Sequence, residues 1–179
     1  MKKILFAISA VLLWFCFSCN SGTTASSSEK ETNSQVQKNL DASHVVSKAF
    51  ETGDASGVDS VIADDFVDHT DHGDVKGKDS LKAMINMVHT SFTDMKQETI
   101  KEIADNDYVF TWMRFTGTSN GAMGMPPGPY DMQAIEAVKC RDGKITEHWE
   151  FMDMRDFGKM MQQMQSMGKN KMDTTKMKK

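Results

Sequence analysis

Residues 134–153, with the sequence AIEAVKCRDGKITEHWEFMD, are the stretch that decides the fold. Apolar and polar side chains alternate on either side of a central RDGK at residues 141–144. An Asp-Gly pair between two alternating runs is a strong hairpin signal, because glycine accepts the positive φ that such turns demand. The stretch therefore predicts two β-strands joined by a tight turn.

The second strand is expected to divide its side chains between two faces, because successive residues of a strand point to opposite sides. One face would carry Ile145, Glu147, Trp149, Phe151 and Asp153, and the other Thr146, His148, Glu150 and Met152. The first face is mostly apolar yet has two carboxylates, which is typical of a pocket wall rather than a solid core. Glu147, Trp149 and Phe151 are therefore predicted to line a ligand pocket.

The first strand of the hairpin carries Glu136 on an otherwise apolar face. Its companions there are Met132, Ala134, Val138 and Cys140. Such a carboxylate is either buried for function or paired with a cation such as Arg114, and the sequence leaves both alternatives open. Glu136 and Trp112 complete the predicted pocket residues.

The first twenty residues, MKKILFAISAVLLWFCFSCN, predict an export signal. Two lysines precede an apolar run at residues 4–17 that is too short to span a bilayer. The end of the run resembles a bacterial lipoprotein signal, cleaved before Cys19, although Cys16 stands where leucine is usual. We expect lipid attachment at Cys19 and a place in the bacterial cell envelope, on its periplasmic or surface side; the alternative is an ordinary secreted protein.

Charge and cysteine content narrow the function classes. Removal of residues 1–18, which hold two lysines and no acid, changes the net charge from −4 to −6. An acidic body argues against nucleic acid and against electrostatic attraction to anionic membranes. Cys140 would be the one cysteine left in the body, so no internal disulfide is expected, and packing is its predicted role.

The rest of the chain predicts helices first and then a run of antiparallel strands, which is an α+β arrangement. The predicted domains are a signal at 1–18, a flexible tether at 19–38, a cone domain at 39–157, and a Met-rich helix with a disordered tail at 158–179. Helices are expected at 41–53, 58–62 and 79–92, strands at 95–103 and 108–116, and a Gly/Pro-rich loop at 119–129. Such a sheet, curled around a helix, can leave a cavity open at one end.

Several short pieces of the chain, in this order, carry a resemblance to a known family. They are Gly53-Asp54, DDFVDH at 64–69, Gly77, FTD at 92–94, DYV at 107–109, Gly117-Thr118, GMPP at 124–127 and DGKI at 142–145, followed by Glu147, Trp149 and Asp153. Over residues 45–153 the chain resembles the SnoaL-like, or ester cyclase, group of the nuclear transport factor 2-like superfamily. The resemblance implies a cone, in which a curved antiparallel sheet wraps around the helices and encloses a ligand cavity. Homodimers are common in the superfamily, but the sequence shows no interface.

The resemblance also implies catalytic residues. In cyclases of this group an acidic cavity residue serves as general acid/base for an aldol closure, and Asp153 is the matching position. Trp149 and Phe151 would desolvate it and raise its pKa, while Asp68 and His69 would orient a carbonyl or relay a proton. Alternatively, Asp153 caps its strand or pairs with Arg155 outside the cavity.

His148, Ser119 and the polar residues at 68–74 have less specific interpretations. His148 is expected to point opposite to Trp149, in a surface or inter-element hydrogen bond, unless a bulge reorients it. The family's histidine after Gly117-Thr118 is replaced by Ser119, so no mechanism that needs an imidazole there is expected. The donors at 68–74 match no closed tetrahedral metal site, and no metal or cofactor is predicted.

Three functional hypotheses follow from the sequence. The first is a lipid-anchored cone that binds a small, partly apolar molecule and performs cyclisation, isomerisation or hydrolysis by acid/base chemistry. The second is a non-catalytic binding or dimerisation module. The third is a Cu(I) protein, because Met161, Met164 and Met167 recur at a spacing that lets thioethers converge along a helix.

Overall fold

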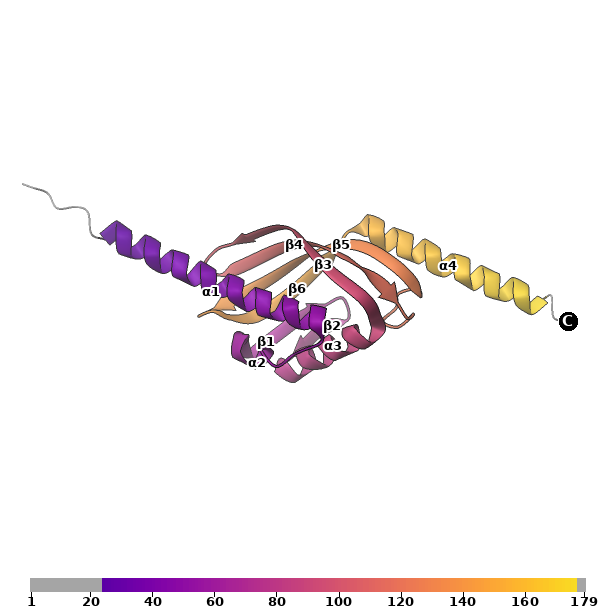
Figure 1. The fold of residues 1–179 in the computed structure, drawn as a ribbon, viewed down its shortest axis with the longest axis horizontal. Helices are drawn as coiled ribbons and strands as arrows, with labels where there is room; N and C mark the ends of the chain where they lie inside the picture. Colours follow the sequence, from indigo (N-terminus) through magenta and orange to yellow (C-terminus); the bar gives the residue numbers. More distant parts are fainter. Residues whose placement is uncertain (1–23, 177–179) are drawn as a thin grey trace, which may run out of the picture.

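A curved sheet forms the body of the protein, and the computed structural model describes residues 24–176. The elements in chain order are α1 (Thr24–Thr52), α2 (Val58–Val61), β1 (Ile62–Thr70), β2 (Gly73–Lys76), α3 (Lys78–Ser91), β3 (Phe92–Ala104), β4 (Tyr108–Ser119), β5 (Gly128–Arg141), β6 (Lys144–Met152) and α4 (Met154–Lys176). α1 crosses the concave side of the sheet, and α4 projects from the opposite end of the molecule (Figure 1). The predicted α+β cone is confirmed.

The six strands lie in the order β2-β1-β6-β5-β4-β3. Neighbouring strands are antiparallel except β1 and β6, which run parallel. The expectation of a purely antiparallel sheet is therefore wrong. β1 and β2 form a hairpin before α3. On its other edge β1 pairs with β6, although these two strands are far apart in the sequence. The short strand β2 was not expected from the sequence.

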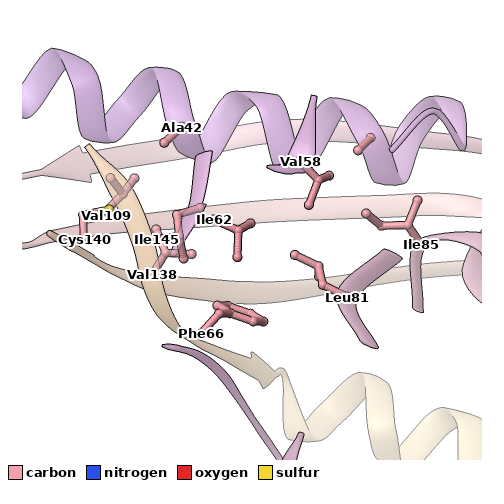
Figure 2. Packing of buried hydrophobic residues seen from close by; sticks show 11 residues of the cluster. Ala42, Val58, Ile62, Phe66, Leu81, Ile85, Val109, Val138, Cys140 and Ile145 are labelled. Carbon is pink, nitrogen blue, oxygen red and sulfur yellow. The ribbon is translucent and has the colours of Figure 1, made fainter. Parts of the chain in front are cut away.

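The core lies between the inner, concave face of the sheet and the three N-terminal helices (Figure 2). It comprises Ala42, Ala49, Val58, Ile62, Phe66, Leu81, Ile85, Val109, Val138, Cys140 and Ile145. Cys140 is buried here, as its predicted packing role requires, and burial raises the pKa of its thiol to about 11. The side chains of β4, β5 and β6 that share a face with Val109, Val138 and Ile145 therefore point toward the inside of the cone.

Asn39 fixes α1 against the sheet. Its side chain is fully buried, and its amide nitrogen donates to the carbonyl oxygens of Asp105 at 3.1 Å and Asn106 at 2.8 Å, in the turn between β3 and β4. Gln35 donates a further hydrogen bond to the Asn39 side-chain oxygen at 2.9 Å. A buried amide must be satisfied, so these contacts determine where α1 lies along the sheet.

α1 differs from the sequence expectation at one end. It ends where predicted, at Gly53, which has a φ of +75° and donates its backbone N–H to the Ala49 carbonyl at 2.8 Å. It begins at Thr24, however, so residues 24–38 are helical and the prediction of a flexible tether there is wrong. Once the segment around Asn39 is held, each added helical residue gains a backbone hydrogen bond, which favours extension of the helix toward the N-terminus.

The C-terminal segment also differs from its prediction. α4 includes the segment that was expected to form a Met-rich helix and continues to Lys176, whereas a disordered tail was expected after residue 167. The other domain boundaries stay predictions. The export signal and Cys19 lie outside the described residues.

Candidate active site

A β-bulge at Thr146 sets the orientation of every later side chain on β6. Cys140 pairs with Ile145 and Lys139 pairs with Glu147, which leaves Thr146 as the extra residue. Its hydroxyl donates to the Lys139 carbonyl at 3.2 Å, and its side chain is buried. Beyond a bulge the alternation of side chains shifts by one residue. His148, Glu150 and Met152 consequently share the inner face with Ile145.

Four ionisable side chains meet on the inner face, and we call them the inner cluster: Asp68, Glu136, His148 and Glu150. Asp68 lies beside His148 in the parallel β1–β6 pair, and His148 lies opposite the core residue Val138. Glu136 lies directly opposite Glu150 across the β5–β6 ladder. Side chains of directly opposed residues are close enough to interact.

Asp68 and His148 form a hydrogen-bonded pair. The distance between Nδ1 of His148 and Oδ1 of Asp68 is 2.8 Å, and the two side chains are 21% and 15% exposed. Burial alone would lower the pKa of His148, but the hydrogen bond to Asp68 and the charges of Glu136, Asp68 and Glu150 outweigh burial and raise it. The pair therefore favours an imidazolium whose Nε2 is left for a proton exchange partner.

Glu136 is the most strongly perturbed carboxyl of the cluster. Burial raises the pKa of Glu136 to about 7; the charge of His148 opposes the increase, while Glu150 and Asp68 add to it. Desolvation likewise raises the pKa of Glu150, although this residue keeps contact with solvent at the open side of the cluster. A carboxyl that exchanges its proton near neutral pH is suited to general acid/base catalysis.

The row of residues next to the inner cluster is apolar. Met113 and Ala134 are buried, and both are in register with half-buried Met152 on β6. On β4, Thr111 lies directly opposite Glu136, and its hydroxyl donates a hydrogen bond to the carboxylate of Glu102 at 3.2 Å. The inner face thus places exchangeable protons beside an apolar strip that can contact the hydrocarbon part of a ligand.

The predicted pocket wall lies on the outer, convex face instead. Trp149 stacks on His69 with ring centroids 4.6 Å apart, and His69 hydrogen-bonds to Glu147 at 3.0 Å. Phe151 and Trp112 are 57% and 44% exposed. These four predicted pocket residues and His69 are therefore not on the inner face. For Glu147, Trp149 and Phe151 the reason is the bulge, which separates them from Ile145, whose parity they were expected to share. Trp112 alternates with the buried Thr111 and Met113 on β4, and His69 alternates with the inward-pointing Asp68 on β1.

Asp68 and His69 do not act as a pair, since they point to opposite faces of β1. Asp68 contacts His148 inside the cone. His69 lies outside between Glu147 and Asp74, and its hydrogen bonds to these two carboxylates raise its pKa. Of this predicted pair, only Asp68 belongs to the inner cluster.

Asp153 is not a desolvated carboxylate, which corrects the main catalytic expectation. Its side chain pairs with Arg155 at 2.6 Å and accepts the backbone N–H of Arg155 at 2.8 Å. These bonds lower the pKa of Asp153 to about 2. The alternative interpretation of Asp153, a partner of Arg155 at the end of β6, matches the structure.

The two alternatives for Glu136 are also separated by the structure. Arg114 lies on the outer face and binds Asp131 at 2.7 Å, so it is not a partner of Glu136. Glu136 is half-buried on the inner face, and its functional role stays a prediction. Within residues 24–176, no three His, Cys, Asp or Glu side chains converge as the ligands of a metal ion would.

Two hollows open on the outer surface and are separate from the inner cluster. One, of about 520 Å³, lies between the outer sheet face and α4, with Arg114, Asp131 and Lys159 in its lining. The other, of about 310 Å³, is lined by Lys139, Glu147 and residues around them. Their charged side chains are largely paired with one another, so neither offers the isolated proton donor that the inner face has.

His148 and Glu150 were missed as functional residues, yet the sequence held a partial signal. Residues equidistant from the turn at Asp142-Gly143 face each other in a regular hairpin. That geometry would place Glu136 opposite Trp149, whereas the one-residue bulge places it opposite Glu150. Glu136 and Glu150, which are nearly equidistant from the turn, were therefore the signal that the sequence contained.

The chain matches one known protein family and several solved structures. Residues 41–164 match the sequence model of the family described as SnoaL-like polyketide cyclase. No protein of curated function matches the chain. IdmH from Streptomyces antibioticus, provisionally assigned as a polyketide cyclase, is 26% identical, with a TM-score of 0.56 over 70% of this chain and 97% of its own.

Two more distant structures share the fold. A nuclear transport factor 2-like protein from Anabaena variabilis is 18% identical, with a TM-score of 0.56 over 65% of this chain and 90% of its own. An LEH-like epoxide hydrolase from M. tuberculosis is 16% identical, with a TM-score of 0.56 over 76% of this chain and 96% of its own. At these identities the likeness shows the fold alone.

The ionisation of Glu136 should appear in both an NMR titration and the stability of the protein. Because the folded pKa of about 7 lies above the ordinary value of 4.5, the native state binds more protons between these pH values. The free energy of unfolding should therefore fall as the pH rises from 4.5 to 7, by at most about 3.5 kcal/mol at 1.4 kcal/mol per pKa unit.

Glu136→Gln should remove this part of the pH dependence, whereas the exposed Glu98→Gln should leave it in place. The measurements are denaturant unfolding across this pH range and carboxyl-carbon NMR of Glu136. A Glu136 carboxyl that titrates near 4.5 would contradict the assignment.

Proposed function

The chain belongs to the SnoaL-like polyketide cyclase family, and on that premise we propose that its cone binds a small, partly apolar molecule and transfers protons to and from it. The observation that carries the proposal is the Glu136 carboxyl, with a pKa of about 7, beside the Asp68–His148 pair. Proton transfer near neutral pH requires groups poised in this range.

The inner cluster supplies both an acid and a base. His148, kept protonated by Asp68, donates a hydrogen bond from Nε2 to a carbonyl oxygen of the ligand. The ionised Glu136 removes a proton from the carbon next to that carbonyl. The electron pair of the C–H bond forms the C=C bond, the carbonyl π electrons move to the oxygen, and the oxygen takes the proton from Nε2 of His148 to give the enol. Glu150, opposite Glu136, disfavours a second negative charge nearby and so maintains the high pKa of the base.

An enol of this kind is the common intermediate for two of the reaction classes that the sequence predicts. In cyclisation, the enol carbon attacks a second carbonyl of the same molecule; in isomerisation, the proton returns at another position. Hydrolysis would instead direct Glu136 to a water molecule. The apolar strip of Met113, Ala134 and Met152 supports a ligand that is largely hydrocarbon around its carbonyl groups.

We also propose that the chain is exported and anchored by lipid at Cys19. The support is in the sequence: Lys2 and Lys3, the apolar run at 4–17, and the cysteine directly after it. In this arrangement the ligand would be met in the cell envelope.

We propose further that the outer face is a homodimer interface. Its large apolar side chains lie in register across β3, β4, β5 and β6 and are each more than 40% exposed: Ile103, Phe110, Trp112, Ile135 and Phe151. A contiguous exposed patch of this kind marks an interaction site. A two-fold contact brings the same patch of both subunits together, so this apolar patch would meet an apolar patch when the partner is a second copy of the chain.

The acid/base proposal is tested by enolisation of a simple ketone. The protein should accelerate exchange of the α-hydrogens of 2-tetralone for solvent deuterium, followed by NMR. Glu136→Gln and His148→Ala should each slow the exchange by about 100-fold or more, and Glu98→Gln should not. The rate should rise with pH through about 7 as Glu136 ionises, and fall again where His148 loses its proton.

Binding of 2-tetralone without acceleration would instead support the non-catalytic binding module. Equal rates for the wild type and Glu136→Gln would overturn the role of Glu136.

Lipid attachment is tested in bacteria fed a radiolabelled fatty acid. The wild type should incorporate label and sediment with membranes, and Cys19→Ser should do neither. Cys16→Ser is the matched control and should still be labelled at Cys19. An unlabelled wild-type protein would favour the ordinary secreted form.

The dimer is tested by sedimentation equilibrium. Trp112→Lys should weaken self-association by about tenfold or more, because a charge would be buried against an apolar surface. Met87→Lys, at a 49% exposed position on α3, should have no such effect. A monomeric wild type would refute the interface.

A further inference from the structure

α4 is held to its own domain through Asp156, while a stripe of apolar side chains on the opposite side of the helix stays exposed. The carboxylate of Asp156 accepts the backbone N–H of Gln133 at 3.1 Å, and Lys159 contacts Asp156 at 2.7 Å beside the outer sheet face. On the opposite side of the helix, Met154, Phe157 and Met161 are 76%, 40% and 37% exposed. An amphipathic helix normally buries its apolar stripe against the core, so this stripe is available to a partner outside the domain.

The charge of this segment is opposite to that of the rest of the chain. Residues 154–179 contain seven Lys and Arg and two Asp, a net charge of +5, within a chain whose total is −4. A negative total charge does not exclude attraction to anionic membranes when the positive charge is concentrated in one segment of the chain, and α4 accounts for residues 154–176 of this segment. α4 extends away from the sheet (Figure 1), so the acidic body does not cover it.

We propose that α4 binds an anionic lipid surface, with Met154, Phe157 and Met161 in the boundary between headgroups and acyl chains. A helix that combines an apolar stripe with many lysines and a low overall hydrophobicity lies in the plane of such a surface. None of the described helices is both long and apolar enough to cross a membrane. The helix would therefore lie on the lipid surface and not span the bilayer.

A second copy of the chain is a weaker match to α4 than lipid. The outer-face carboxylates of Asp131 and Glu147 are already paired with Arg114 and Lys139, so they offer little free negative charge to a basic helix. Anionic headgroups supply that charge continuously along the surface and attract each Lys or Arg that comes close to it. This proposal concerns α4 alone and is independent of the chemistry of the inner cluster.

The test is hydrogen–deuterium exchange of the full chain, measured by mass spectrometry on peptides from residues 154–166. Vesicles of phosphatidylcholine and phosphatidylglycerol should slow exchange in this segment roughly tenfold or more, and vesicles of phosphatidylcholine alone should not. Because the readout is local to α4, membrane contact by the N-terminal segment does not affect it.

Phe157→Gln combined with Met161→Gln should abolish the protection, and Gln preserves the helix because its helix propensity is high. Met87→Gln on α3 is the matched control and should retain the protection. Unchanged exchange on anionic vesicles would overturn the proposal, as would equal protection on neutral ones. Protection that grows with protein concentration in the absence of vesicles would identify a second copy as the partner and likewise overturn it.

Discussion

The extra residue at Thr146 is the constraint on which the site depends. Without it, β6 would continue its alternation from buried Ile145, and Glu147, Trp149 and Phe151 would enter the cone. With it, His148 and Glu150 enter instead, and the aromatic residues form the outer surface. The bulge is stabilised by the hydrogen bond from the buried Thr146 hydroxyl to the Lys139 carbonyl. This local contact therefore helps to set which side chains of β6 face the inside of the cone and which face the outer surface.

The change of side-chain alternation at the bulge also explains how the inner face tolerates the acidic groups of the inner cluster. Glu136, Glu150 and Asp68 lie on one face and would repel one another if all were ionised. His148 lies among them and provides a positive charge, and the high pKa of Glu136 removes a negative one. The cluster thus limits its own charge by holding protons, and groups that hold protons near neutral pH are also those that can release them.

The fold was largely accessible from the sequence, because its signals are local. The Asp142-Gly143 turn, the helical stop at Gly53 and the alternation on β4 and β5 each depend on a few adjacent residues. The site was accessible only in part. Glu136 stood out as a carboxylate on an apolar face, whereas His148 and Glu150 depend on a bulge that no Gly or Pro announces. The pairing of Asp153 with Arg155, two residues further on, was one of the alternatives that the sequence offered, whereas the role of His69 depends on Glu147 and Trp149, which only the folded geometry brings into contact with it.

The length of α1 determines how far its N-terminal end lies from the cone. A helix rises 1.5 Å per residue, so the fifteen steps from Thr24 to Asn39 make a strut of roughly 22 Å. Asn39 is fixed to the turn at Asp105 and Asn106, and the strut therefore turns together with the sheet as one rigid piece. The N-terminal end of α1 at Thr24 thus has a set distance and direction relative to the cone.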